Sequence, residues 1–188
     1  MEFELLADSI KQINDKASSA AKSAVNQLMT LRNWAIGYYI VEYEQDGSDR
    51  AEYGSHLLKN FEKQIDQKGM NYTLFKACGK FYKVYPQIGS TVSSEIKLSD
   101  FGKSSTVSNE FVTDPHVLVN NVSFSHIREI MVLNDAFERF FYETECMKFN
   151  WNVRELRGQI KTNLYVIAGI RKKPELLLKK SVDNANGT

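Results

Sequence analysis

Two groups of basic residues have a spacing that would place several positive charges on one side of a helix. The first basic stripe is Lys76, Lys80 and Lys83, spaced i, i+4, i+7. The second basic stripe is Arg154, Arg157 and Lys161, spaced i, i+3, i+7. Residues at these intervals lie on the same helix face. Because apolar residues occupy the opposite face in both segments, each helix could pack on the protein while its cations reach nucleic-acid phosphates.

Polar residues at the starts of the same two helices could read base edges. Asn71 and Thr73 precede the first stripe, and Asn152 and Arg154 begin the second. Arginine stays charged at neutral pH and can form two parallel hydrogen bonds to phosphate or guanine, so the second stripe should contribute more to specificity. The alternative is that both stripes are ordinary solvated faces of amphipathic helices, and the sequence leaves both interpretations open.

Residues for catalysis are sparse. Glu95-Ile96-Lys97 matches half of a PD-(D/E)XK nuclease motif, in which carboxylates hold Mg²⁺, but no upstream Asp on a strand accompanies it. Three His and two Cys show no metal-ligand spacing, and there is no glycine-rich phosphate loop. We expect His126 to be a surface residue near a helix N-terminus, and Cys78 and Cys146 to be core thiols. The sequence therefore predicts no catalysis, metal or cofactor.

The composition is that of a globular protein with a substantial core. The 188 residues include 24 Lys and Arg against 23 Asp and Glu, and 43% are apolar. No apolar run is long enough to span a membrane and no secretion signal is recognisable, so we expect no membrane association. Two cysteines do not form a disulfide framework, which suits the cytoplasm.

The charges are unevenly distributed along the chain. Residues 51–86 carry six basic and three acidic side chains, whereas residues 1–50 carry five and eight. Residues 87–122 are net −2, residues 123–163 are balanced, and residues 164–188 are net +3. The first basic stripe thus lies in a locally basic region of a nearly neutral chain, as expected for contact with a polyanion.

A long N-terminal helix should position these elements. No Gly or Pro occurs from Met1 to Ile36, and apolar or small residues recur in steps of three and four from Leu6 to Tyr38. A small domain cannot cover such a helix along its whole length, so part of it should pack on a second long helix or a second copy, and we predict a homodimer. The alternative is two shorter helices with a break near Ser18-Ser19.

The remaining pattern predicts shorter helices separated by turns. They are expected at 51–67, 72–84, 125–133, 136–148 and 153–166. Asn71, Asp135 with Asn134, and Asn152 are suitable N-terminal caps, and Ser125 with Glu129 suggests another. Residues 87–122 are rich in Ser, Thr and Asn and predict a mobile loop or a short β-hairpin.

These segments define the expected organisation. Residues 1–86 contain the long helix and a first helix-turn-helix, residues 87–122 the polar insertion, residues 123–169 a second helical segment of the same domain, and residues 170–188 a frayed polar tail. The predicted fold is mainly α, a helical module of the winged-helix or helix-turn-helix type.

Three segments resemble a known family. Leu31 to Gln45, the run Ser123-Phe124-Ser125-His126-Ile127-Arg128, and Trp151-Asn152-Val153-Arg154-Glu155-Leu156 are similar to the N-terminal domain of the YhcG family, bacterial proteins grouped as predicted PD-(D/E)XK nucleases. The similarity covers roughly 28–86 and 123–166, and the insertion does not match. The family's first recognition helix usually carries arginines where this chain has Lys76 to Lys80.

The resemblance implies a DNA-binding, winged-helix-like module whose nuclease lies in a separate C-terminal domain that this chain does not reach. We therefore predict a non-catalytic module that binds double-stranded DNA. The alternative is a protein-interaction module that docks a nuclease or another subunit of a defence system. Salt dependence separates the two, because only phosphate neutralisation gives a steep slope.

Overall fold

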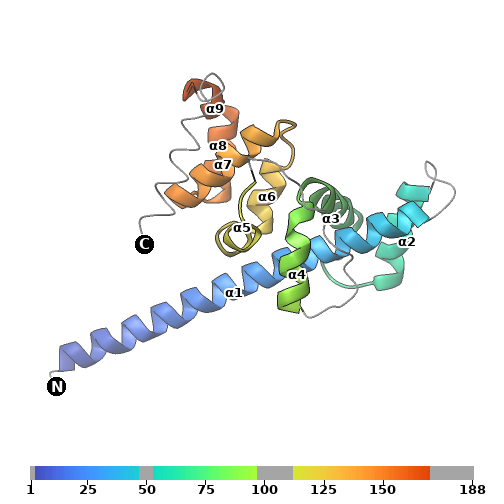
Figure 1. Ribbon diagram of the computed structural model, residues 1–188. Helices are drawn as coiled ribbons and strands as arrows, with labels where there is room; N and C mark the ends of the chain where they lie inside the picture. Colours follow the sequence, from blue (N-terminus) through green and yellow to red (C-terminus); the bar gives the residue numbers. More distant parts are fainter. Residues whose placement is uncertain (1–2, 47–52, 97–111, 170–188) are drawn as a thin grey trace.

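The computed structural model describes residues 3–46, 53–96 and 112–169, and every regular element in them is helical (Figure 1). The elements are α1 (Phe3–Asp46), α2 (Tyr53–Ile65), α3 (Tyr72–Val84), the short 3-10 helix η1 (Pro86–Ile88), α4 (Gly89–Ile96), α5 (Pro115–Asn121), α6 (Phe124–Ile130), α7 (Ala136–Phe149), α8 (Val153–Lys161) and α9 (Leu164–Ile167). The mainly α prediction is confirmed. The described ranges hold no β-strand, so the β-wing of a winged helix is not present in them.

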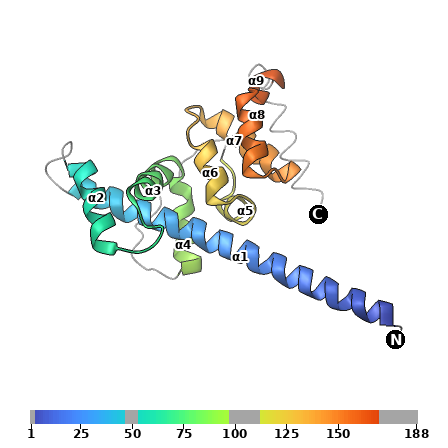
Figure 2. The same cartoon turned by 180° about the vertical axis from the view of Figure 1, so that it is seen from behind.

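Helix α1 is the spine of the molecule. It runs without a break for 44 residues, so the alternative of two helices separated near Ser18-Ser19 is wrong. Helices α3, α4, α5 and α6 contact its C-terminal half, while the N-terminal half extends away from the body (Figures 1 and 2). The change from exposed to buried occurs at Thr30 and Leu31, which are both 0% exposed.

Three apolar clusters form the core. The central cluster joins α1 to α3, α4, α5 and α6 through Leu31, Trp34, Phe81, Ile88, Val92, Leu118 and Ile127. A second cluster lies among α7, α8, α9 and the end of α6, and it contains Ile130, Phe141, Tyr142, Leu156 and Tyr165. A third cluster holds α2 against α1 and α3 through Ile40, Leu58 and Phe75.

A series of buried hydrogen bonds connects these helices. The Trp34 indole N–H donates to the Tyr85 carbonyl at 2.8 Å, and the Tyr85 hydroxyl donates to Glu143 at 2.7 Å. The Thr113 hydroxyl donates to the other carboxylate oxygen of Glu143. Glu143 is only 3% exposed, and its burial raises the pKa of the carboxyl. The sequence analysis did not single out this residue.

The structure corrects the prediction for 87–122 where it describes that segment. Residues 89–96 and 115–121 are helical, and Asp114 caps α5 by accepting from the Val117 N–H at 3.0 Å. A loop or hairpin is wrong there, because Ile88, Val92 and Leu118 are fully buried in the central cluster and their burial stabilises the short helices. Residues 97–111 lie outside the described residues, as does the predicted tail at 170–188.

Two further boundary predictions are wrong. Ser123, not Ser125, occupies the N-cap position of α6, so the proposed Ser125–Glu129 cap does not form. The single helix predicted over 153–166 is divided between α8 and α9, because Asn163 adopts a left-handed conformation with φ of 56°. No helix in the described ranges is long and apolar enough to cross a membrane.

Candidate nucleic-acid interface

Helix α3 presents the first basic stripe to solvent. Its start is fixed by Asn71, whose side-chain oxygen accepts from the Leu74 N–H at 2.9 Å, and the predicted bounds 72–84 are confirmed. Phe75, Cys78 and Phe81 are buried on one side of the helix. Lys76, Lys80 and Lys83 are all exposed on the other side. The expected division between an apolar face and a basic face is therefore present.

Helix α1 supports α3 more extensively than α2 does. The two helices cross closely enough that Gly37 of α1 packs on the backbone of α3. The Tyr82 hydroxyl of α3 donates to the Glu42 carboxylate of α1 at 2.8 Å. This hydrogen bond also holds the two helices together. In a helix-turn-helix the helix before the recognition helix does most of this packing. Here the long helix holds the candidate recognition helix in place.

Helix α8 presents the second basic stripe. Asn152 and Glu155 form a capping box at its start: the Asn152 side chain accepts from the backbone N–H groups of Arg154 and Glu155, and Glu155 accepts from the Asn152 N–H at 2.8 Å. Leu156 is fully buried and anchors the helix in the second cluster. Arg154, Arg157 and Lys161 are exposed.

An ion pair changes the character of this second stripe. Arg157 donates to both carboxylate oxygens of Glu129 on α6, at 2.6 and 3.1 Å. The hydrogen bond from Arg157 is the main reason that the pKa of Glu129 is lowered. Part of the positive charge of Arg157 is thus neutralised within the protein. Arg154 has no ion-pair partner among the residues that the structure describes.

Arg128 is a basic residue that the site prediction missed. It is exposed on α6, and its charge contributes to the lowered pKa of Glu129 on the same helix and partly opposes the rise that burial causes in the pKa of Cys78 on α3. Helix α6 contacts both α3 and α8 and lies between them (Figure 1). The signal available in the sequence was its position in the Ser-His-Ile-Arg segment used for the family resemblance. The two stripes thus lie on helices that both contact α6, and α6 carries a further exposed cation.

The polar candidates for base contacts occupy helix starts. Asn71, Thr73 and Asn152 are exposed, as their predicted role requires. Asn71 and Asn152 use their side-chain oxygens as helix caps, which fixes the orientation of each carboxamide. Whether any of them contacts a base stays a prediction.

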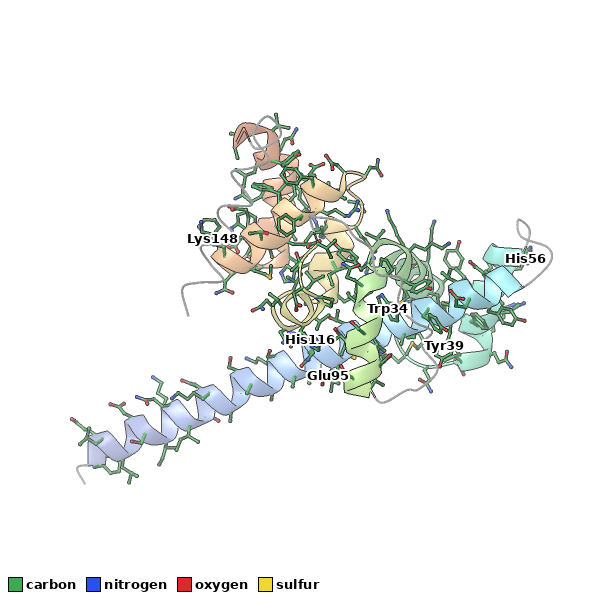
Figure 3. All side chains as sticks on the ribbon, viewed as in Figure 1. Trp34, Tyr39, His56, Glu95, His116 and Lys148 are labelled. Atoms are coloured by element: carbon green, nitrogen blue, oxygen red, sulfur yellow. The ribbon has the colours of Figure 1, made fainter. Side chains whose placement is uncertain are left out.

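The residues considered for catalysis do not converge. Glu95 is exposed and lies on helix α4, not on a strand, and Lys97 falls outside the described residues. Figure 3 shows His56 and His116 on separate parts of the molecule. In the part of the chain that the structure describes, no group of three His, Cys, Asp or Glu could hold a metal ion.

The two cysteines and His126 are part of the packing and hydrogen bonding of the fold. Cys78 and Cys146 are buried free thiols, as predicted, and burial raises their pKa values to about 12 and about 11. His126 lies in the first turn of α6 but is half-buried, contrary to the surface position predicted. Its Nδ1 is 2.7 Å from the Ser123 hydroxyl and its Nε2 is 3.0 Å from the Trp151 carbonyl, so it joins α6 to the turn before α8.

The fold and the two stripes define the class of the chain as a helical domain that exposes two basic stripes. The particular family follows from comparison with known proteins: the chain belongs to the DUF1016 N-terminal domain family, whose model matches residues 9–166. It is 32% identical over 174 residues to the Escherichia coli (strain K12) protein named "Putative nuclease YhcG". The match covers 87% of this chain and 46% of the relative, so the chain spans about half the length of the curated relative. No solved structure matches it. The family resemblance predicted from the sequence is confirmed.

Proposed function

We propose that the chain is a DNA-binding module that does not itself catalyse a reaction. The observation that carries this proposal is the exposure of Lys76, Lys80 and Lys83 along one face of α3, whose other face is buried in the core. A buried helix face gives the stripe a fixed orientation, and lysines in that orientation can neutralise successive phosphates of a duplex. Arg128 and the second stripe extend the basic surface across α6 and α8.

The module would divide its contacts between phosphates and bases. Lys76, Lys80, Lys83 and Lys161 are suited to phosphates because lysine acts as a mobile point charge. Asn71, Thr73, Asn152 and Arg154 lie at helix starts and are suited to base edges: a guanidinium matches guanine, and the capping asparagines, whose Oδ1 atoms accept backbone N–H groups, can donate from Nδ2. Arg157 would need to exchange Glu129 for a phosphate, and it therefore contributes less than its type alone suggests.

The relation to the family gives the module a context. The Escherichia coli relative carries the name "Putative nuclease YhcG", and this chain matches about half of it. We infer that the chain serves as the DNA-recognition part of a nuclease-related protein, and that the chemistry resides outside the matched half. The free thiols of Cys78 and Cys146 suit a reducing compartment, so we place the module in the cytoplasm.

One surface favours a second function, binding of another protein subunit. A groove of about 680 Å³ lies between α1, α2 and α3 and is lined by aromatic and aliphatic residues, among them Tyr39, Tyr43, Phe61 and Ile65. Tyr39 and Tyr43 are 50% and 61% exposed. Apolar contacts in such a groove would not release counterions, so this function predicts no strong salt dependence.

A titration of duplex DNA separates the two functions. Fluorescence anisotropy with a labelled random-sequence duplex at about 50 mM salt should show binding at micromolar or tighter affinity, and affinity should fall steeply as salt rises. Absence of binding at this salt concentration contradicts the DNA-binding proposal. It would leave the groove as the stronger candidate for function.

A further inference from the structure

The N-terminal half of α1 carries an apolar stripe that the body does not cover. The seam consists of Phe3, Leu6, Ile10, Ile13, Ala17, Ala20 and Ala24. Its members alternate in steps of three and four, which is the heptad pattern of a helix that pairs with another helix. Phe3 is 82% exposed and Ile13 is 68% exposed. Single exposed apolar residues are ordinary, but a continuous row of them marks an interaction surface.

The seam is asymmetric in size, and this asymmetry selects one partner and one orientation. Its first half holds large side chains and its second half holds only alanines. If two copies align antiparallel so that facing residue numbers add to 30, Leu6, Ile10 and Ile13 each meet an alanine, and Phe3 meets Gln27 at the end of the pair. The facing pairs are then Leu6 with Ala24, Ile10 with Ala20, and Ile13 with Ala17. A parallel pair would place large residues together at one end and alanines together at the other, which leaves voids in the packing.

The residues that directly flank the seam are mostly small and uncharged. In the heptad pattern of the seam, Glu4, Asp8 and Lys22 fall on the outer faces of the helix, whereas Lys16 lies beside it. The positions that flank the seam include Ala7, Ser9, Ala21 and Ser23, and such small residues let two helices approach closely.

The length of the exposed helix agrees with this alignment. The side chains are exposed from Phe3 to Asn26, and full burial begins at Thr30. When the numbers of facing residues add to 30, the two helices overlap over almost all of this stretch. The overlap ends where the body of each copy begins. The bodies then lie at opposite ends of the paired helices, as the projection of α1 from one side of the body allows (Figure 2).

We propose that two copies of this chain associate through an antiparallel coiled coil of residues 3–27. The geometry brings Ile10 of one copy against Ala20 of the other. It separates the two Ile10 residues by ten helical positions, about 15 Å along the axis. This is too far for a disulfide, whose Cα atoms lie within about 7 Å of each other.

Cysteine cross-linking tests the orientation directly. Ile10→Cys carrying an affinity tag is mixed with untagged Ala20→Cys in a glutathione redox buffer under native conditions, where the native thiols are buried. The proposal predicts a disulfide between the tagged and untagged chains and no cross-linked product from either variant alone. Gln12→Cys with Ser18→Cys is the matched control: these residues also add to 30 but lie on the outer faces, so no cross-link should form.

Light scattering supplies the second measurement. The wild-type chain should have twice the monomer mass at tens of micromolar, and Ile13→Lys should have the monomer mass. Ile13 does not contact the core, so this variant should keep the helical circular dichroism of the wild type. A monomeric wild type, or self-cross-linking of Ile10→Cys, overturns the proposal. Neither result depends on DNA, so the proposed function stands or falls separately.

Discussion

Gly37 on α1 lies directly against the backbone carbonyl of Cys78 on α3. A Cβ atom added at Gly37 would be 2.0 Å from the Cys78 carbonyl oxygen and 2.5 Å from its carbon. Because both neighbours are backbone atoms, they cannot rotate away as a side chain would. This close crossing places the candidate recognition helix on the long helix, so the orientation of the first basic stripe depends on a glycine.

Gly37→Ala should therefore destabilise the protein by about 2 to 3 kcal/mol, since the added methyl group forces the two helices apart. The matched control is Gly158→Ala on α8, where an added Cβ meets nothing within 4 Å. That control should stabilise the protein by up to about 1 kcal/mol through helix propensity. Urea denaturation followed by circular dichroism measures both changes. Equal stabilities of Gly37→Ala and wild type would show that the helices do not cross as described.

The buried carboxyl of Glu143 should make stability depend on pH. Burial raises its pKa above the 4.5 of the unfolded chain, although the hydrogen bonds from Thr113 and Tyr85 oppose the shift. As pH rises above about 4.5, the unfolded chain ionises first, so the free energy of unfolding should fall until the folded pKa is passed. Below pH 4.5 the Glu143 carboxyl is protonated in both the folded and the unfolded state, so its burial no longer lowers the free energy of unfolding through its charge.

Glu143→Gln isolates this contribution, because the neutral amide keeps an acceptor for the Tyr85 hydroxyl. As pH rises through this window, the free energy of unfolding of the variant should increase relative to that of the wild type. The measurement is a series of urea denaturations between pH 4 and 8. A difference that does not vary with pH contradicts a buried, perturbed carboxyl at this position.

Both cysteines should be inert until the protein unfolds. Burial raises the pKa of Cys78 to about 12 and that of Cys146 to about 11, so almost no thiolate exists at neutral pH. A thiol-specific reagent such as DTNB should label neither residue in the native state and both in urea. Fast labelling of either thiol without denaturant would contradict its burial.

Glu129 should restrain DNA binding through Arg157. Glu129→Gln removes the charge that holds the guanidinium, so we expect tighter binding at low salt and a salt slope steeper by about one unit. Arg157→Ala should change both quantities in the opposite direction. Arg157 is exposed and Glu129 is only partly buried, so loss of the pair should change the melting temperature little. Weaker binding by Glu129→Gln would show that the ion pair organises α8 and does not compete with DNA.

The parts of the fold that the sequence predicted correctly have local signals. The bounds of α3 follow from the Asn71 cap and from Pro86, which cannot continue the helix, and the starts of α7 and α8 follow from their caps Asp135 and Asn152. Helix α4 lacks such a signal, because its Ser-rich sequence resembles a loop, whereas α5 has one in Asp114 followed by Pro115 that the sequence analysis did not use. Their stability comes from burial of Val92 and Leu118 against distant parts of the chain, which periodicity within a short window cannot reveal.

The same distinction applies to the site. Exposure of Lys76, Lys80 and Lys83 could be predicted because it depends only on helix periodicity. The Arg157–Glu129 pair joins residues 28 positions apart on different helices, so no local sequence pattern predicts it. Glu143 was missed for a similar reason: a glutamate in a helix resembles a surface residue in the sequence, and its burial depends on Tyr85, which follows α3 and is 58 positions away.

The most direct test of DNA binding by α3 compares two pairs of lysines that carry the same charge. Lys76→Ala with Lys80→Ala removes two charges from the first basic stripe, and Lys11→Ala with Lys22→Ala removes two from the outer faces of the exposed part of α1. The measurement is the slope of log affinity for duplex DNA against log salt concentration. The stripe pair should reduce the slope by about two units, roughly one for each lost phosphate contact, and the α1 pair should leave it near the wild-type value. Equal slopes for the stripe pair and the wild type, with both proteins folded, would contradict recognition of DNA by α3.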